Sequence, residues 1–291
     1  MKKALFQLHI AVFLAGFTGL LGALIQLNEG LLVWYRMLMA VFILGIILWY
    51  KKEFKSVSKK DGLKIMVVGA IVALHWVSFY GSIKYANVSI ALICFSSIGL
   101  FTALLEPLFF KRRIDRIELL LGLMAIAGIY LIFSFNPNFL TGILLGIISA
   151  LLAVIFSILN KQFVERIPPK TLTFFELGGG WLFLSLILPF YIYLFPSEKL
   201  TPSLIDWFWL LILAAVCTVW AFELQLKALK KLSPFTNNLI YNLEPVYGIA
   251  LAFIFLKENK EFGSTFYWGL AIIMLAVLFQ MLRMLKHKKI H

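Results

Sequence analysis

The sequence predicts an all-α integral membrane protein in which ten transmembrane helices form two inverted five-helix repeats. Three observations support this fold class: the composition, the spacing of the apolar segments and an internal repeat. Of the 291 residues, 62% are hydrophobic and 14% are charged, whereas a soluble domain is about half apolar and a quarter charged. A single soluble core cannot bury this excess, so we expect a lipid bilayer to solvate it.

Ten apolar segments have the length of a membrane-crossing helix, which is about 20 residues. Short polar links join them and leave no room for a soluble domain. Their continuous apolar character also differs from the alternating pattern of a membrane β-strand. The predicted helices cover residues 5–26, 31–50, 62–83, 87–110, 117–135, 141–161, 172–195, 204–226, 234–256 and 264–285.

Basic residues in the links predict the orientation of these helices. If the N-terminus lies inside the cell, the inner side holds 21 Lys and Arg and the outer loops hold 4. Cytoplasmic loops are enriched in these residues, so the sequence predicts both termini in the cytoplasm. The basic residues form short clusters between apolar runs, and the net charge of +13 therefore indicates no nucleic-acid partner.

The two halves of the chain resemble each other. An offset of 146 residues aligns IGLFTALLEPLFFK (98–111) with EPVYGIALAFIFLK (244–257), and an offset of 140 places Arg36 over Glu176. The predicted repeats are residues 1–135 and 141–291. Each contains an odd number of helices, so equivalent helices cross the membrane in opposite directions. This architecture is typical of secondary transporters, which bind their substrates near the membrane midplane between the repeats.

Three stretches resemble the EamA type of the drug/metabolite transporter superfamily: WYRMLMA (34–40), SIKYANVSIAL (82–92) and LEPVYGIALAFIFLKE (243–258). The resemblance covers nearly the whole chain, in two halves. It implies a ten-helix inner-membrane carrier with both ends in the cytoplasm. Many members of the family export amino acids or other small metabolites.

One position departs from the family pattern. A proline usually stands where this chain has Gly99, in register with Pro245 of the second half, and here a proline follows only at Pro107. Proline loosens a helix one turn back by removing a backbone N–H. We therefore expect Pro245 and the glycines around Gly99 to act as hinges, with a softer or shifted kink in the first half.

The most polar stretch of the apolar segments is NNLIYNLEPVYG in the ninth predicted helix. Its polar and helix-breaking residues are Asn237, Asn238, Tyr241, Asn242, Glu244 and Pro245. They share one half of the helix surface, and buried polar groups need partners, so we expect them to face other helices or a wet cavity. Substrate binding with proton sensing fits this pattern. Association of helices through polar side chains fits it as well.

The third predicted helix carries a second set of candidates, with His75 near its mid-depth and Trp76 and Tyr80 on the neighbouring stripe. Aromatic side chains with a polar end suit a cavity that accepts small organic molecules. A histidine titrates near neutral pH and could couple to protons, while a core histidine bonded to a carbonyl is the alternative. The resemblance supports the cavity, because the family's central cavity draws on this helix.

Three charged residues lie within the helices. Arg36 could attract a carboxylate, lock an outer gate or extend to the surface. Glu176 lies at a similar depth from the opposite surface, so we expect no pairing between them. Glu223 lies one turn before Lys227, which an ion pair explains simply. The gating or coupling candidates are Arg36, Gly99, Glu176, Glu223 and Pro245; the substrate-binding candidates are His75, Trp76, Tyr80, Ser96, Asn160, Asn237, Asn238, Tyr241, Asn242 and Glu244.

Other short motifs indicate packing. The run GGG (178–180) follows no strand and lies within a span, which predicts close helix packing and not phosphate binding. Cys94 and Cys217 are distant residues of apolar segments and are interpreted as small apolar side chains.

The sequence carries no enzyme motif, ATP-binding loop or metal-binding pattern, and we expect no cofactor. The energy source would then be a gradient of the substrate or of protons. The prediction is a secondary transporter, monomeric or homodimeric, that exports small organic metabolites such as amino acids by alternating access. Two alternatives stay open: an intramembrane enzyme with His75 and Glu244 as acid and base, and a non-transporting membrane sensor or assembly factor.

Overall fold

A computed structural model of the chain describes residues 2–111, 113–134, 137–197, 199–232, 234–241 and 243–287, and every regular element in them is helical. Most are α-helices; η1 and η4 are 3₁₀ turns, and η2 and η3 are π-helical. In chain order the elements are α1 (Lys2–Leu24), α2 (Glu29–Tyr50), α3 (Lys59–Tyr85), α4 (Val88–Phe95), α5 (Ile98–Phe110), α6 (Arg116–Ser134), η1 (Pro137–Phe139), α7 (Leu140–Val164), α8 (Pro169–Leu194), α9 (Leu204–Ala214), η2 (Ala215–Trp220), α10 (Ala221–Leu229), α11 (Pro234–Tyr241), α12 (Glu244–Leu251), η3 (Ala252–Leu256), η4 (Glu258–Lys260) and α13 (Ser264–His287).

Each apolar range predicted from the sequence is largely helical in its described residues. Within these residues, 7 helical segments are long and apolar enough to cross a membrane, and shorter apolar helices cover Glu244–Leu256 and Ser264–Phe279. Large apolar side chains also point outward: Phe42 and Ile254 are 68% exposed and Leu186 is 81% exposed. An apolar surface of this kind is suited to lipid and not to water.

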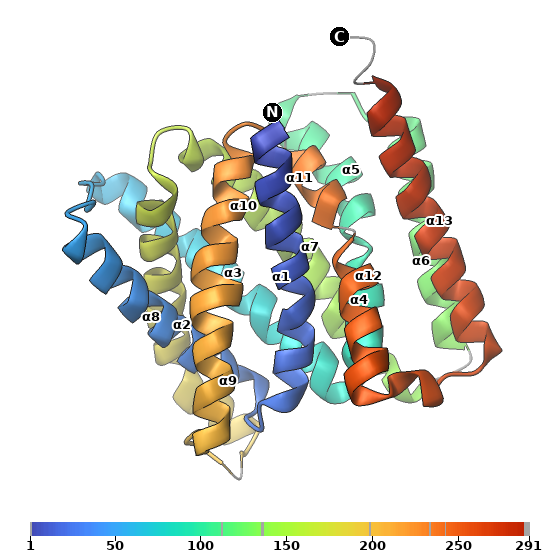
Figure 1. The fold of residues 1–291 in the computed structure, drawn as a ribbon, viewed down its shortest axis with the longest axis horizontal. Coiled ribbons are helices and arrows are strands. Elements are labelled where there is room, and N and C mark those ends of the chain that lie inside the picture. The colour runs from blue at the N-terminus through green and yellow to red at the C-terminus, as the bar shows by residue number, and fades with distance from the viewer. Residues whose placement is uncertain are drawn as a thin grey trace.

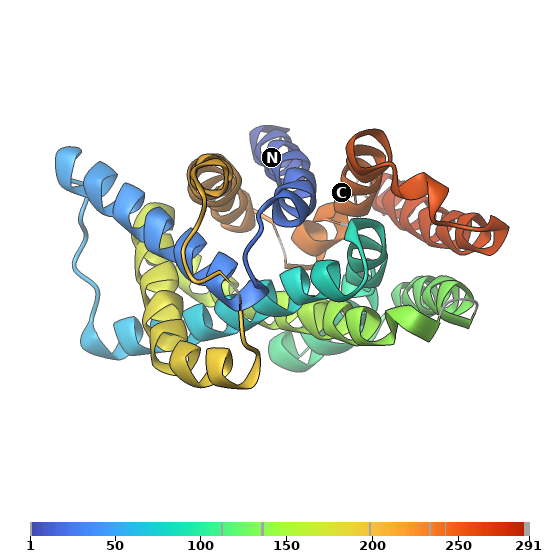
Figure 2. The same ribbon diagram turned by 90° about the horizontal axis from the view of Figure 1, so that it is seen from below.

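The helices run side by side, and α1 begins at the same end of the bundle as α13 ends (Figure 1). Seen along the bundle in Figure 2, α1, the α9–α10 segment and α12 lie on one side, and α3, α4 and α7 lie on the other. Helices of one half pack against helices of the other. In particular, α3 packs against α7 and α8, and α1 packs against α10 and α12.

The run GGG (178–180) allows one of these contacts to be close. A methyl group added at Gly180 would lie 2.5 Å from the carbonyl oxygen of Gly69 on α3, and one at Gly179 would lie 2.4 Å from the Cα of Met66. The prediction of close packing is confirmed for these two glycines. Gly178 has nothing within 4 Å of such a methyl group, so it plays no part in the contact.

Two helices are interrupted at equivalent positions. In the first half α4 ends at Phe95 and α5 begins at Ile98, and in the second half α11 ends at Tyr241 and α12 begins at Glu244. Both boundaries differ by 146 residues, which is the offset of the sequence alignment. The same offset relates Lys111 to Lys257, which follow the two segments and have φ angles of 52° and 60° in the left-handed region.

The expectation of a shifted kink in the first half is wrong, because the break between α4 and α5 lies at the equivalent position without a proline. Ser96 donates its hydroxyl to the carbonyl of Ile93 at 2.6 Å, and Ser97 donates to that of Cys94 at 2.7 Å. Such hydroxyl bonds compete with the helical ladder and bend helices. Pro107, by contrast, lies inside α5 without ending it.

Candidate functional site

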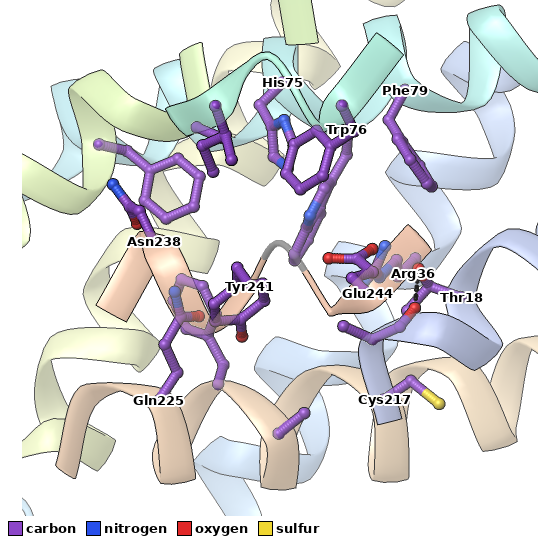
Figure 3. A pocket seen from close by; sticks show the side chains of 17 residues that line it. Thr18, Arg36, His75, Trp76, Phe79, Cys217, Gln225, Asn238, Tyr241 and Glu244 are labelled. Atoms are coloured by element: carbon purple, nitrogen blue, oxygen red, sulfur yellow. Dashed lines mark hydrogen bonds between the residues drawn. The ribbon is translucent and has the colours of Figure 1, made fainter. Parts of the chain in front are cut away.

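A cavity with a volume of about 70 Å³ lies beside the two helix breaks (Figure 3). The third, fourth, eighth and ninth predicted helices contribute to its wall through α3, α4 with α5, η2 with α10, and α11 with α12. Residues of α1, α2 and α7 complete the wall.

Arg36 is the charged residue that α2 brings to the cavity wall. Its Nε donates to the hydroxyl of Thr218 at 2.7 Å, and one terminal nitrogen donates to the hydroxyl of Tyr80 at 2.8 Å. The guanidinium carbon lies 3.6 Å from the centre of the Trp76 ring, which is a cation–π contact. The side chain is only 3% exposed, so it lies within the protein and does not extend to the surface.

A π-helical turn places Thr218 beside Arg36. The Thr218 hydroxyl donates to the carbonyl of Leu213, five residues back, at 2.7 Å, while its oxygen accepts the bond from Arg36. Single π-turns inside α-helices are frequent at functional sites. Sequence reasoning missed Thr218, because one threonine in an apolar run carries no signal that distinguishes it from an ordinary helix residue.

Glu244, the first residue of α12, is the second charged group of the wall. It is 5% exposed and lies on the same side of the cavity as Arg36 and Thr18 (Figure 3). The charges of Glu244 and Arg36 interact, although no direct ion pair joins these two described side chains. The cavity therefore contains opposite charges, and the N-terminus of α12 favours the carboxylate.

His75 of α3 lies in the aromatic part of the wall. Its Nδ1 is 2.9 Å from the backbone carbonyl of Ser149, and the ring centre is 5.6 Å from that of Phe95 and 5.4 Å from that of Phe156. The Ser149 hydroxyl oxygen also lies 2.9 Å from Nδ1, so this nitrogen donates to the carbonyl in one tautomer and accepts from the hydroxyl in the other. His75 therefore lies beside a backbone carbonyl, as expected of a core histidine, and it also lines the cavity, as expected of a substrate-binding residue.

Asn238 and Tyr241 bring α11 to the opposite side of the cavity, near Gln225 of α10 (Figure 3). The Asn238 amide donates to the hydroxyl of Thr102 at 3.1 Å, and its oxygen accepts a bond from Ser157 at 3.0 Å. Asn238 therefore joins α5, α7 and α11 and also faces the cavity. Gln225 and Thr18 are lining residues that the sequence analysis missed.

The remaining substrate-binding candidates lie away from the cavity surface. Tyr80 is fully buried and holds Arg36. Ser96 forms part of the first helix break, and Asn237 donates to Asn238 at 3.1 Å. Asn160 donates to Glu176 of α8 at 2.9 Å. Asn242 lies outside the described residues.

The gating candidates separate into two groups. Arg36 lines the cavity, and Gly99 and Pro245 are each the second residue of the helix that follows a break. Glu176 lies outside the cavity, bonded to Asn160, and does not pair with Arg36. Glu223 accepts from Lys227 at 2.6 Å near the end of the bundle, which is the ion pair expected from their spacing.

Polar contacts between the halves close the end of the bundle opposite the termini. Asp206 accepts a bond from the backbone of Gln26 at 2.8 Å. The carboxylate of Glu258 accepts a bond from the Ser89 hydroxyl at 2.6 Å and bonds from the first backbone N–H groups of α4.

Ion pairs between the halves close the end that carries the termini. Lys170 lies 2.8 Å from Glu53, and this hydrogen bond holds the pKa of the Glu53 carboxyl below its usual value. Arg283 of α13 bonds Asp115, which precedes α6, and likewise lowers the pKa of that carboxyl. These contacts join the two halves at both ends of the bundle.

The described part of the chain contains no group of three or more His, Cys, Asp or Glu side chains that could hold a metal ion. Cys94 and Cys217 are both free and buried, and Cys217 lines the cavity. The wall therefore offers hydrogen bonds, opposite charges and aromatic surfaces for a small molecule.

An apolar outer surface and long apolar helices define a multi-pass α-helical membrane protein, and a cavity with charged groups lies between its helices. Residues 2–134 and residues 140–282 each match the EamA-like transporter family. The chain belongs to this family of membrane transporters.

Curated relatives are described as uncharacterized transporters. The uncharacterized transporter YetK of Bacillus subtilis is 24% identical over 77% of this chain and 69% of its own length. An uncharacterized transporter of Archaeoglobus fulgidus is 23% identical over 81% of this chain and 83% of its own length. A solved crystal structure that is 15% identical superposes with a TM-score of 0.69 over 96% of this chain and 97% of that chain, which shows the same fold.

Proposed function

We propose that this protein is a secondary transporter that exports amino acids or related small metabolites, and that its substrate binds between Arg36 and Glu244. The observation that carries the proposal is this pair of oppositely charged side chains in the wall of one cavity beside two helix breaks. The guanidinium has five N–H donors, and its bonds to Thr218 and Tyr80 leave donors for a carboxylate. Glu244 would bind an ammonium group.

The aromatic wall supports an organic substrate. Trp76, Phe79, Phe95 and Phe156 line the cavity together with His75. Aromatic and apolar surfaces provide most of the contact area in small-molecule sites, and a few polar groups fix the orientation of the ligand. An amino acid would place its charged groups between Arg36 and Glu244 and its side chain against these rings.

The size of the cavity supports alternating access. Small-molecule sites are typically about 300–1,000 Å³, whereas this cavity is about 70 Å³, and polar contacts join the two halves at both ends of the bundle. The lining helices must separate before most metabolites can enter. In the proposed cycle the contacts at one end break while those at the other end hold, and the two helix breaks act as hinges near Gly99 and Pro245.

The proposed topology has ten membrane crossings, both termini in the cytoplasm, and inverted repeats at residues 1–135 and 141–291. The bias of 21 basic residues on the inner side against 4 on the outer side supports it. So does the position of the start of α1 and the end of α13 at the same end of the bundle. We place the protein in the inner membrane on the same grounds.

The distribution of polar groups favours a carrier over the sensor alternative. A sensor or assembly factor would bury polar stripes dry between helices. Here Arg36, Glu244 and Asn238 face one cavity although they come from α2, α12 and α11. No comparable observation favours an intramembrane enzyme.

The test is flux of radiolabelled amino acids in proteoliposomes, with and without a pH gradient. Wild type is expected to transport. Glu244→Gln is expected to lower the affinity for substrates that carry an ammonium group by about tenfold or more, because a hydrogen bond to a charged group contributes roughly 1.5–3 kcal/mol. Glu165→Gln, which changes an exposed carboxylate directly after α7, is the control and should transport normally. Absence of flux for a broad panel of amino acids and related metabolites would contradict the proposal.

A further inference from the structure

A second buried carboxyl group lies outside the cavity, where α7 and α8 meet. Glu176 of α8 is 0% exposed and Asn160 of α7 is 1% exposed. The amide nitrogen of Asn160 donates to Oε1 of Glu176 at 2.9 Å. The described structure offers no hydrogen-bond partner to the other two oxygens, Oε2 of Glu176 and Oδ1 of Asn160. This pair has no part in the cavity described above.

The unpartnered oxygens have a simple explanation in the shapes of the two groups. A carboxyl and a carboxamide are planar units of the same shape, so they can join through two parallel hydrogen bonds. The first bond is the one from the Asn160 amide. The second needs a hydrogen between two oxygens that both accept, and only a proton on Glu176 supplies it.

Burial favours the same conclusion. A buried carboxylate without a cationic partner is costly, by several kcal/mol in a low-dielectric environment. Among the residues that the structure describes, no ion pair joins a charged side chain to the Glu176 carboxyl, which accepts its hydrogen bond from Asn160. Charged or titratable groups of the helices packed around it have other partners. Arg36 of α2 bonds Thr218 and Tyr80, and His75 of α3 bonds Ser149. The ion pairs are Lys161 of α7 with Glu165, Lys170 of α8 with Glu53, and Glu223 of α10 with Lys227.

We propose that Glu176 and Asn160 form a proton-binding site outside the cavity, in which a carboxylic acid and a carboxamide share two hydrogen bonds, and that this proton is coupled to transport. The coupling rests on the function proposed above, whereas proton binding does not. When the proton leaves, the O–H bond of Oε2 breaks, the proton passes to water and Glu176 becomes a carboxylate. When it returns, the bond to Oδ1 of Asn160 forms again.

The position of Glu176 explains how proton binding and movement of the halves are linked. Its carbonyl oxygen lies against α3 of the first half, where a methyl group on Gly69 would be only 1.9 Å away. The tight contact between α3 and α8 keeps the carboxyl out of water. Separation of these helices would hydrate the carboxyl, and a hydrated carboxyl loses its proton far more readily than a buried one. The closed contact therefore requires the proton.

A metal cation is a weaker explanation of the same oxygens. Hard cations take six or more oxygen ligands, whereas this pair offers two unpartnered oxygens. A proton needs one oxygen that carries it and one that accepts its hydrogen bond. The proposal is therefore limited to a proton, and sodium becomes one outcome of the test.

The direct test is infrared difference spectroscopy of the purified full-length protein in lipid nanodiscs at neutral pH. The carbonyl stretch of a protonated carboxylic acid is expected in wild type, unchanged in Glu244→Gln and absent in Glu176→Gln. A band that is missing from wild type, or that disappears in Glu244→Gln and persists in Glu176→Gln, would overturn the proposal. A band that appears only when sodium is replaced by choline would also overturn it, because sodium would then occupy the site.

Thermal unfolding shows whether the variant remains folded. The side-chain amide introduced by Glu176→Gln can make both hydrogen bonds with Asn160, so this variant is expected to unfold at the wild-type temperature or above it. Asn160→Leu removes the partner and is expected to lower the unfolding temperature and shift the infrared band of Glu176. If Glu176→Gln were strongly destabilised, an ionised carboxylate would be required there and the proposal would fail.

Transport then tests the coupling alone. In proteoliposomes Glu176→Gln is expected to keep exchange of substrate across the membrane, while accumulation driven by a pH gradient falls to the level measured without a gradient. Normal gradient-driven accumulation in this variant would overturn the coupling. If wild type transports nothing while the infrared band is present, the proposed function fails and the proton site stands.

Discussion

The two halves of this protein differ most at one pair of equivalent positions. Arg36 and Glu176 align at an offset of 140 residues and lie in equivalent helices, α2 and α8. Arg36 lies in the cavity wall, stacked on Trp76, whereas Glu176 lies outside the cavity and bonds only Asn160. Equivalent positions in the repeat therefore lie in equivalent helices. The side chains packed around each position determine what chemistry its residue can perform.

The two helix breaks show the opposite case. They lie at equivalent positions in the two halves, but different residues form them. Two serines that bond the preceding carbonyls end α4, and Pro245 follows the break before α12. Both arrangements interrupt the backbone hydrogen bonds of the helix. The serine hydroxyls compete for the carbonyls, and proline lacks the N–H donor. A helix break is thus retained at this position in each half although its chemical cause has changed.

The largest expected effect tests the difference between Arg36 and Glu176. Arg36→Lys keeps a positive charge but loses the planar donor group and its stacking on Trp76. We expect substrate affinity to fall by about 10-fold to 100-fold, since hydrogen bonds to charged groups contribute roughly 1.5–3 kcal/mol. Direct substrate-binding measurements on purified protein would show it. Glu176→Gln is the matched control and should bind as wild type, so equal losses would remove the distinction between the two positions.

The next effect concerns the contact between the halves at α3 and α8. Gly69→Ala would place its methyl group 1.9 Å from the carbonyl oxygen of Glu176, so backbone must move. Overpacking of this kind costs about 1–3 kcal/mol, measured as a lower temperature of unfolding in detergent. Gly178→Ala is the control, because nothing lies within 4 Å of the added methyl group. If both variants unfolded at the same temperature, the close contact would carry no stability.

A smaller effect would sharpen the comparison of the breaks. Gly99→Pro would make the first break resemble the second, and the N–H that it removes bonds Ser96 only at 3.5 Å. Proline is tolerated in the first turn of a helix, so we expect the stability to change by less than about 1 kcal/mol. Ala103→Pro, inside α5, should cost about 3 kcal/mol or more. Similar losses from both substitutions would show that α4 and α5 behave as one continuous helix.

The smallest effect lies at the end that carries the termini. The hydrogen bond from Arg283 lowers the pKa of Asp115 from its usual 3.8, so the pair stabilises the folded state above that pH and loses its contribution as pH falls through the lowered value. Because this pair is partly exposed, Asp115→Asn should cost less than about 1 kcal/mol at neutral pH. Thermal unfolding at neutral and acidic pH should show the difference from wild type shrink in acid, and a difference that grew in acid would contradict this sign.

Most of the helices could be predicted from the sequence, because apolar segments of about 20 residues and polar links follow from the thickness of a bilayer. Glu244 and His75 were found as cavity residues because polar groups at membrane depth are costly and therefore conspicuous. The run GGG likewise predicted the packing of α8.

Other features depend on contacts between distant segments and could not be read from local patterns. The π-turn that brings Thr218 to Arg36 changes the register of one helix, and nothing in a single apolar run indicates it. The walls from α1 and α7 consist largely of small or apolar residues such as Ala15 and Ala153, which look like any membrane helix. Glu176 is conspicuous in the sequence, yet only packing shows that it lies outside the cavity.

The separation of Glu176 from the cavity has an electrical consequence. A zwitterion held between Arg36 and Glu244 carries no net charge, so its passage alone does not respond to membrane voltage. A proton carried at Glu176 adds one elementary charge to each cycle, and that charge gains or loses about 2.3 kcal/mol per 100 mV. At about 1.4 kcal/mol per tenfold concentration ratio, this energy sustains a roughly 50-fold gradient of solute. One carboxyl group between α7 and α8 would thus connect the solute gradient to the membrane potential.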